Sequence, residues 1–148
     1  MKKIFTIISA LLLTVTLFAQ RSAQLTREQQ LNKKYTSGLF STPEGVYFDM
    51  EGDNASYSAV SYFNVLDWLQ GRVAGLQIYN YQGNRIPFIR NNPASIFVDE
   101  MRVDAGFLNA LPVADIAMIK VIKSPFFGFW GGGGAIAIYT KDGGDPEE

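Results

Sequence analysis

The chain has 148 residues, and its 13 basic and 14 acidic side chains leave a formal net charge of −1. This balance provides no basic surface, so we expect neither nucleic acid nor anionic lipid as a partner. Histidine and cysteine are both absent. Their absence removes the commonest general base, the commonest metal ligand and every Ser-His or Cys-His nucleophile pair. The composition therefore argues against an enzyme.

Residues 1–19 have the pattern of a signal peptide. Lys2 and Lys3 form a basic start, Ile4–Phe18 is largely apolar, and Ala19 offers a small residue at the cleavage point. The apolar stretch is short for a membrane span. An uncleaved anchor is the alternative, but we expect a cleaved signal and export to the periplasm.

Residues 20–63 predict an N-terminal arm followed by a loop-rich segment. Ser22–Lys34 is polar and rich in helix formers, which predicts a short, weakly amphipathic helix or a mobile arm. Tyr35–Asn54 contains several glycines, a proline and one candidate strand, Val46–Phe48. The aromatic residues of this stretch indicate that it packs on another surface, either of this protein or of a partner.

Residues 64–141 contain most of the predicted secondary structure. Asn64–Gly71 predicts a helix, because asparagine is a good N-terminal cap and glycine a good C-terminal cap. We expect strands at Leu76–Tyr81 and Pro87–Arg90. We also expect a hairpin of Ser95–Val98 and Met101–Val103 that turns at Asp99 and Glu100.

The last part of this region predicts two longer strands. A short helical stretch at Phe107–Leu111 precedes them and ends at Pro112. Ile116–Ile122 is rich in β-branched residues, and Ala135–Tyr139 alternates small and large side chains, as strands do. Pro125 lacks a backbone donor and therefore ends the first of these strands. Residues 142–148 form an acidic tail that we expect to be disordered.

An aromatic segment and a glycine hinge connect these two strands: Phe126, Phe127, Phe129 and Trp130, then Gly131, Gly132, Gly133 and Gly134. Glycine permits backbone angles that other residues resist, which predicts a tight, mobile connection. A phosphate loop is disfavoured, because no Gly-Lys-Ser/Thr sequence leads into a helix. Four large aromatics so close together cannot all face one core. Packing in the core and contact with a partner both remain open, and we favour partner contact.

Two groups of acidic residues have spacings that resemble chemical sites. Asp49, Glu51 and Asp53 are spaced like the start of a calcium loop, but the glycine comes one position too early and no closing glutamate follows. We interpret them as a solvated loop. Asp99 and Glu100 are adjacent on a hairpin turn, where two carboxylates normally lie in water, and no nucleophile lies beside them in the sequence. We therefore expect no catalytic site, no metal and no cofactor.

Three segments in order carry a family resemblance: NVLDWLQGRVAGLQI from residue 64, IFVDEMRV from residue 96 and LPVADIAMIKVIKSP from residue 111. With the Ile-rich strand that ends in Thr140 and Lys141, they resemble the plug domain of TonB-dependent outer-membrane receptors, especially the SusC-like group. In the second segment Glu100 and Met101 replace the family's usual glycine-containing turn. The resemblance covers Val65–Lys141. It implies an α+β fold with a small mixed β-sheet and short helices.

The resemblance also implies a role at the outer membrane. Plugs of the family sit inside a β-barrel and gate it, and the present sequence ends where that barrel would begin. We expect a non-catalytic periplasmic module, peripheral to the membrane, that docks on or occludes an outer-membrane β-barrel protein or channel complex made by another chain. The aromatic segment is the expected contact, with Arg72 and Arg90 as secondary polar contacts. The alternatives are a periplasmic carrier of a small ligand and a remnant of a TonB-dependent transporter.

Overall fold

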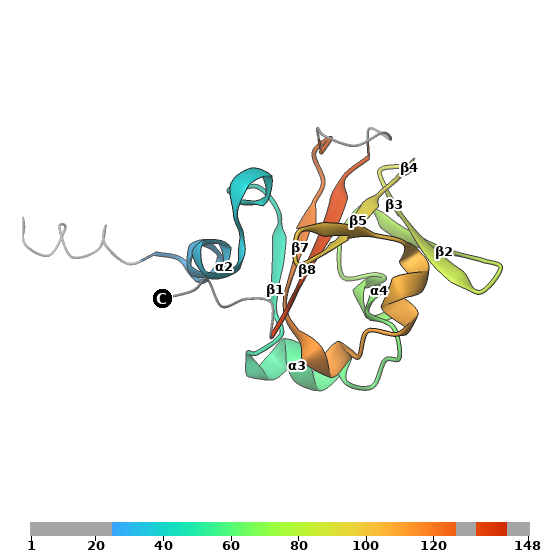
Figure 1. Cartoon of the computed structure of the whole chain (residues 1–148), viewed down its shortest axis with the longest axis horizontal. Coiled ribbons are helices and arrows are strands. Elements are labelled where there is room, and N and C mark those ends of the chain that lie inside the picture. The colour runs from blue at the N-terminus through green and yellow to red at the C-terminus, as the bar shows by residue number, and fades with distance from the viewer. Residues whose placement is uncertain (1–24, 127–132, 142–148) are drawn as a thin grey trace, which may run out of the picture. The chain divides into compact units, whose positions relative to one another are not determined.

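The computed structural model describes residues 25–126 and 133–141 (Figure 1). The chain divides into two compact units, one up to Gln30 and one from Leu31 onward. In the first unit the described residues begin helix α2 (Arg27–Tyr35), which continues into the second. Thr26 and Gln29 start this helix as a capping box: the Gln29 amide donates to Thr26 Oγ1 at 3.3 Å and the Thr26 amide to Gln29 Oε1 at 3.0 Å.

The second unit is built on a five-stranded mixed sheet in the order β1-β7-β8-β5-β6. Its strands are β1 (Val46–Asp49), β5 (Ser95–Val98), β6 (Met101–Val103), β7 (Ile116–Ile122) and β8 (Ala135–Thr140). Strand β8 pairs antiparallel with β7 and parallel with β5. The β-branched residues of β7 and β8 suit this central position, because both faces of these strands are covered.

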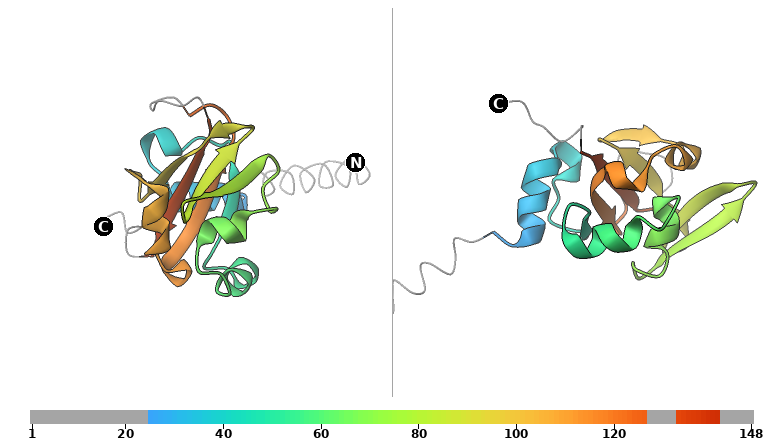
Figure 2. Two further views of the ribbon diagram at one scale, coloured as in Figure 1. Left: turned by 90° about the vertical axis from the view of Figure 1, so that its right-hand side faces the viewer. Right: turned by 90° about the horizontal axis from the view of Figure 1, so that it is seen from below.

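A second, three-stranded sheet contains β2 (Leu76–Tyr81), β3 (Asn84–Ile89) and β4 (Asn92–Pro93). The hairpin of β2 and β3 extends away from the five-stranded sheet (Figure 2). Side chains also hold the end near its turn: Arg85 Nε donates to both carboxylate oxygens of Asp67 at 2.6 Å, and Arg85 Nη1 donates to Asn109 Oδ1 at 3.3 Å. The small sheet is thereby tied to the short helices beside it.

Short helices complete the described fold. They are α3 (Asp53–Ala59), α4 (Val65–Leu69) and the 3-10 turns η1 (Gly38–Phe40), η2 (Ala105–Asn109) and η3 (Val113–Asp115). Helix α4 begins where expected, because the buried side chain of Asn64 accepts a hydrogen bond from the Leu66 amide at 2.9 Å. Among the described residues, no helix has the length and apolar character needed to cross a membrane.

The five-stranded sheet separates two apolar cores. On one face, α3, α4 and the base of the small sheet cover Ile119, Val121, Ile136 and Ile138. On the other face, Leu31, Tyr35 and Phe40 cover a second set, which consists of Phe97, Ala117, Met118, Ile122, Ala135, Ala137 and Tyr139. The central strands therefore bury both of their faces.

The structure confirms the predicted fold class and most of the predicted elements. Strand β1 matches the candidate at Val46–Phe48, and it joins the large sheet by pairing with β7. Helix α3 was not predicted, because Gly52 and the acidic residues around it favour a loop. In the structure, Asp49 Oδ1 accepts hydrogen bonds from the amides of Glu51 and Gly52, each at 3.2 Å, and this turn leads into α3.

Candidate interaction site

The aromatic segment leaves the sheet at Phe126, the only one of its four aromatics among the described residues. The half-buried Phe126 ring packs on Phe40 and Phe97, with centroid distances of 5.0 and 5.6 Å. Its amide donates to the Gly133 carbonyl at 3.2 Å. This bond fixes the two ends of the connection beside each other. Phe127, Phe129, Trp130, Gly131 and Gly132 lie outside the described residues.

Gly133 and Gly134 are required by close packing of the backbone. A Cβ on Gly133 would lie 2.1 Å from the Pro93 carbonyl oxygen, and one on Gly134 would lie 2.1 Å from the Ile122 carbonyl oxygen. Neither glycine has a positive φ. At these two positions the sequence interpretation, which invoked unusual backbone angles, is replaced by a steric reason: no side chain fits there.

A cavity of about 330 Å³ lies beside Phe126. Its wall is mostly apolar and also holds one carboxylate: Leu39, Thr42, Pro43, Glu44, Ile122, Ser124, Pro125 and Phe126. Half of these residues come from the segment before β1 and half from the end of β7 and the residues after it. The cavity is at the small end of the volumes that hold small molecules.

The segment before β1 is fixed to the sheet by Lys120, which is fully buried on β7. Its Nζ donates to Asn32 Oδ1 at 2.7 Å, to the Phe40 carbonyl at 2.5 Å and to the Thr42 carbonyl at 2.5 Å. It also lies 4.9 Å from the centroid of the Tyr47 ring. Burial lowers the pKa of Lys120 to about 8, because the charged form loses its hydration.

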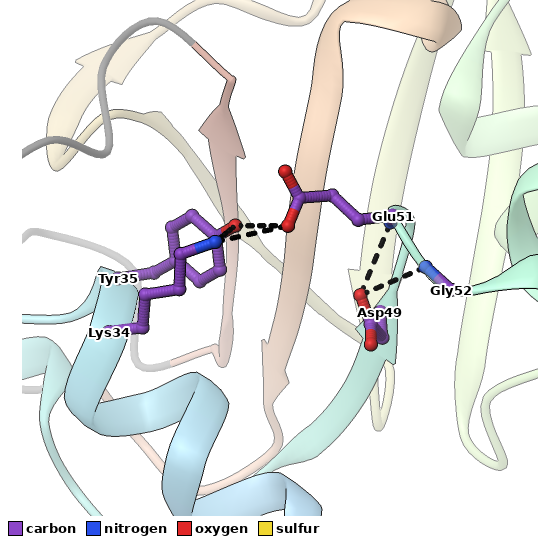
Figure 3. A network of polar contacts seen from close by, with 5 residues as sticks. All are labelled: Lys34, Tyr35, Asp49, Glu51 and Gly52. Atoms are coloured by element: carbon purple, nitrogen blue, oxygen red, sulfur yellow. Dashed lines mark hydrogen bonds and ion pairs between the residues drawn. The ribbon is translucent and has the colours of Figure 1, made fainter.

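A second polar contact joins the end of α2 to the residues after β1 (Figure 3). Tyr35 Oη donates to Glu51 Oε2 at 2.8 Å, and Lys34 Nζ lies 3.1 Å from the same oxygen. Hydrogen bonds from Tyr35 and Lys34 lower the pKa of Glu51. Lys34 and Glu51 are largely exposed to solvent, so this ion pair orients α2 and contributes little stability.

The Asp99–Glu100 turn differs from its prediction, since both carboxylates are half-buried and bound instead of lying in water. Asp99 accepts hydrogen bonds from the amide and the hydroxyl of Thr140, each at 2.8 Å. Glu100 accepts one from the Ser37 amide at 2.6 Å, one from the Ser37 hydroxyl and one from Tyr139 Oη at 3.3 Å. Their φ angles of 47° and 65° give the left-handed turn of a tight hairpin, which turns these side chains back onto the fold.

The two arginines that were predicted to contact a partner have local partners. Arg72 is exposed, donates to the Trp68 carbonyl and lies over the Trp68 and Tyr62 rings, 4.7 and 5.7 Å from their centroids. Arg90 is exposed at the turn between β3 and β4, with a φ of 51°, and its amide donates to Gly75 at 2.9 Å. They lie in different turns, separate from Phe126 in the sequence.

Sequence reasoning missed two features. In the sequence, Lys120 is a single basic residue within an apolar strand. Its burial depends on carbonyl oxygens that lie about eighty positions earlier in the chain, which a local pattern cannot indicate. Exposed aromatic and apolar side chains also follow one another from α3 to the loop before α4: Tyr57, Val60, Tyr62 and Phe63, the last of which is 97% exposed. In the part of the chain that the structure describes, no three acidic residues gather in a way that could hold a metal ion.

No protein-family model and no curated protein matches the sequence. Solved structures do match. The RagAB peptide importer in its open-open state aligns with a TM-score of 0.54 and 20% identity, over 66% of this chain and 12% of that one. The siderophore receptor PirA from Acinetobacter baumannii aligns with a TM-score of 0.52 and 19% identity, over 80% of this chain and 19% of that one.

A third match is the ferric enterobactin receptor PfeA from Pseudomonas aeruginosa, with a TM-score of 0.51 and 22% identity, over 66% of this chain and 17% of that one. All three are TonB-dependent receptors. At this identity the likeness concerns the fold alone, and the chain spans less than a fifth of each receptor. The chain thus has an α+β fold that matches one part of TonB-dependent receptor structures.

Proposed function

We propose that this chain is a non-catalytic, plug-like module of the cell envelope. In this proposal it docks on or occludes an outer-membrane β-barrel protein or channel complex made by another chain. The observation that carries the proposal is the fold, which matches three TonB-dependent receptors over 66–80% of the chain. The three family-like sequence segments, which form α4, β2, β5, β6 and β7, support the same function.

The proposed contact is the aromatic segment between β7 and β8. Phe127, Phe129 and Trp130 are its main residues, because Phe126 is packed against Phe40 and Phe97 in this structure. Aromatic side chains are common anchors of protein interfaces, since they bury a large area at a low entropic cost. Arg72 and Arg90 are secondary polar contacts in the proposal.

The proposed location is the periplasm, in association with the outer membrane. Its support is the signal-like sequence of residues 1–19 and the outer-membrane receptors among the structural matches.

A pull-down from the native envelope in mild detergent, after brief cross-linking, tests the proposal. We expect the tagged wild-type chain to recover one outer-membrane β-barrel protein, and Trp130→Ala to lose it while melting within a few degrees of the wild type. Loss of an interface anchor costs about 2 kcal/mol of binding or more. Phe63→Ala is the control, because it truncates an exposed aromatic in a different segment.

Two results would contradict the proposal. One is equal recovery of the same protein by the wild type and by Trp130→Ala. The other is a much lower melting temperature for Trp130→Ala, because loss of a core tryptophan costs about 3–5 kcal/mol of stability.

The cavity beside Phe126 favours a second candidate, a carrier of a small, mostly apolar ligand. Native mass spectrometry of the protein purified from its own envelope distinguishes the two. A bound small molecule that is lost in Pro43→Trp, which fills the cavity, would support the carrier. An empty wild-type protein that still recovers the β-barrel would support the docking module.

A further inference from the structure

Residues 31–44 form a strap across one face of the five-stranded sheet. The strap contains the end of α2, the turn η1 and the loop before β1. Its buried side chains Leu31, Tyr35 and Phe40 are only 5%, 8% and 6% exposed, and they pack on the second apolar core. Without the strap, an apolar surface that includes Met118 and Ala137 would face water.

The strap is attached by side chains instead of by strand pairing. Among the described residues, its backbone-to-backbone hydrogen bonds remain within α2 and its own turns, and strand pairing with the sheet begins only at β1. Its polar contacts with the rest of the fold include those made by the side chains of Lys120, Glu100, Glu51 and Tyr47. Such a segment can separate from the sheet without breaking a strand ladder.

The buried ammonium of Lys120 makes separation easier. Its donors are satisfied by neutral oxygens of the strap, and in the described part of the chain its hydrogen-bond partners include no carboxylate. Burial removes the Lys120 charge from water, which makes the charged form less favourable here and lowers its pKa. When the strap lifts, Lys120 becomes hydrated, and this hydration compensates for part of the lost contacts.

The strap is also connected to the proposed contact site. Phe40 of the strap holds the Phe126 ring at 5.0 Å, and the strap supplies half of the wall of the cavity beside Phe126. When the strap moves away, the Phe126 ring therefore loses its contact with the Phe40 ring.

We propose that the strap is a releasable cover that opens as a unit while the sheet stays folded, and that its opening frees the Phe126 ring for the partner. The part that concerns the partner rests on the proposed function. The opening itself does not, and it can be measured on the isolated protein. While the strap is closed, Phe126 would stay packed against Phe40 and would be unable to bind the partner.

Cysteine labelling tests the opening, because the natural chain has no cysteine. Met118→Cys places a thiol under the strap, and Ile119→Cys places one on the opposite face of the same strand. Both positions are fully buried, and the two residues have similar volumes. With a small maleimide in excess, we expect Met118→Cys to react at least about 30-fold faster than Ile119→Cys, after correction for the stability of each variant in urea.

Adding Phe126→Ala to Met118→Cys tests whether the contact between Phe126 and the strap helps to keep the strap closed. We expect labelling to become about 2- to 10-fold faster, since an aromatic contact to the strap is lost. The same addition to Ile119→Cys should leave the corrected rate unchanged. If Met118→Cys does not fold, Ala137→Cys on β8 is the replacement, because this position is also fully buried under the strap.

Equal corrected rates on the two faces would overturn the proposal, because the strap would then open only with global unfolding. Faster labelling at Met118→Cys that Phe126→Ala does not change would overturn the connection to Phe126. Neither result depends on the envelope pull-down, so a failure of the docking function can be told apart from a failure of the strap.

Discussion

Lys120 shows that a buried charged group can have all of its hydrogen bonds and still lower the stability of the fold, because its hydration is lost. Three strap oxygens accept its hydrogen bonds, yet its charge has been removed from water on a strand that is buried on both faces. Neutral acceptors stabilise an ammonium group less than bulk water and a counter-ion do, so the pKa of Lys120 is lowered to about 8.

This pKa predicts an unusual pH dependence of stability. Between pH 8 and 10 the unfolded chain keeps the Lys120 proton while the folded chain releases it, so the free energy of unfolding should rise with pH. We expect a rise of about 1–2 kcal/mol in urea titrations of the wild type. Above pH 10 the raised pKa values of Tyr35 and Tyr139 act in the opposite direction.

Lys120→Met is the control for this prediction. It removes the titrating group, so its free energy of unfolding should stay level between pH 8 and 10. A rise of the same size in Lys120→Met would show that another group is responsible.

The glycines before β8 give a second prediction at this scale. Gly134→Ala should lower the free energy of unfolding by about 1–3 kcal/mol, because its Cβ meets the Ile122 carbonyl oxygen at 2.1 Å. Gly106→Ala is the matched control, since its Cβ would make ordinary contact, 3.5 Å from Asn84 Oδ1. Chemical denaturation of both variants measures the difference in the free energy of unfolding. Equal stabilities of the two variants would refute the steric explanation for Gly134.

At the scale of elements, the sequence predicted what depends on local pattern. Strands β2, β5, β6, β7 and β8 follow from β-branched or alternating residues, and α4 follows from its asparagine cap. What it missed depends on distant contacts. Helix α3 follows glycines and carboxylates that favour a loop, and Glu100 finds Ser37 sixty-three positions earlier. The role of Lys120 and the presence of the strap could not be predicted for the same reason.

The cap of α4 is the element-scale prediction. Asn64→Ala removes the acceptor of the Leu66 amide and the donor to Asn109 Oδ1, which lies 2.9 Å away. We expect a loss of about 1–2 kcal/mol in urea, at the upper end for a cap because Asn64 is buried. Asn64→Ser keeps a neutral acceptor for the Leu66 amide and should lose less. A stability equal to the wild type in Asn64→Ala would contradict this function of the side chain.

For the whole molecule, the proposed export predicts a shortened protein. Expressed from its own start codon in a Gram-negative host, the chain should occur in the periplasmic or outer-membrane fraction without about nineteen residues, because residues 1–19 have the pattern of a signal peptide. N-terminal sequencing of the fractionated protein is the measurement. A cytoplasmic protein that begins at Met1 would contradict export.

The central place of β8 has a consequence for when the molecule can fold. Strand β8 lies between β7 and β5, and Ala135 pairs with Ser95, so the sheet cannot close until the chain has been synthesised through Thr140. Parallel pairing across such a separation is slow, because the loop entropy is lost before the contacts form. For the export proposed above, this order of synthesis would leave the chain unfolded, and therefore able to be translocated, until β8 has been made.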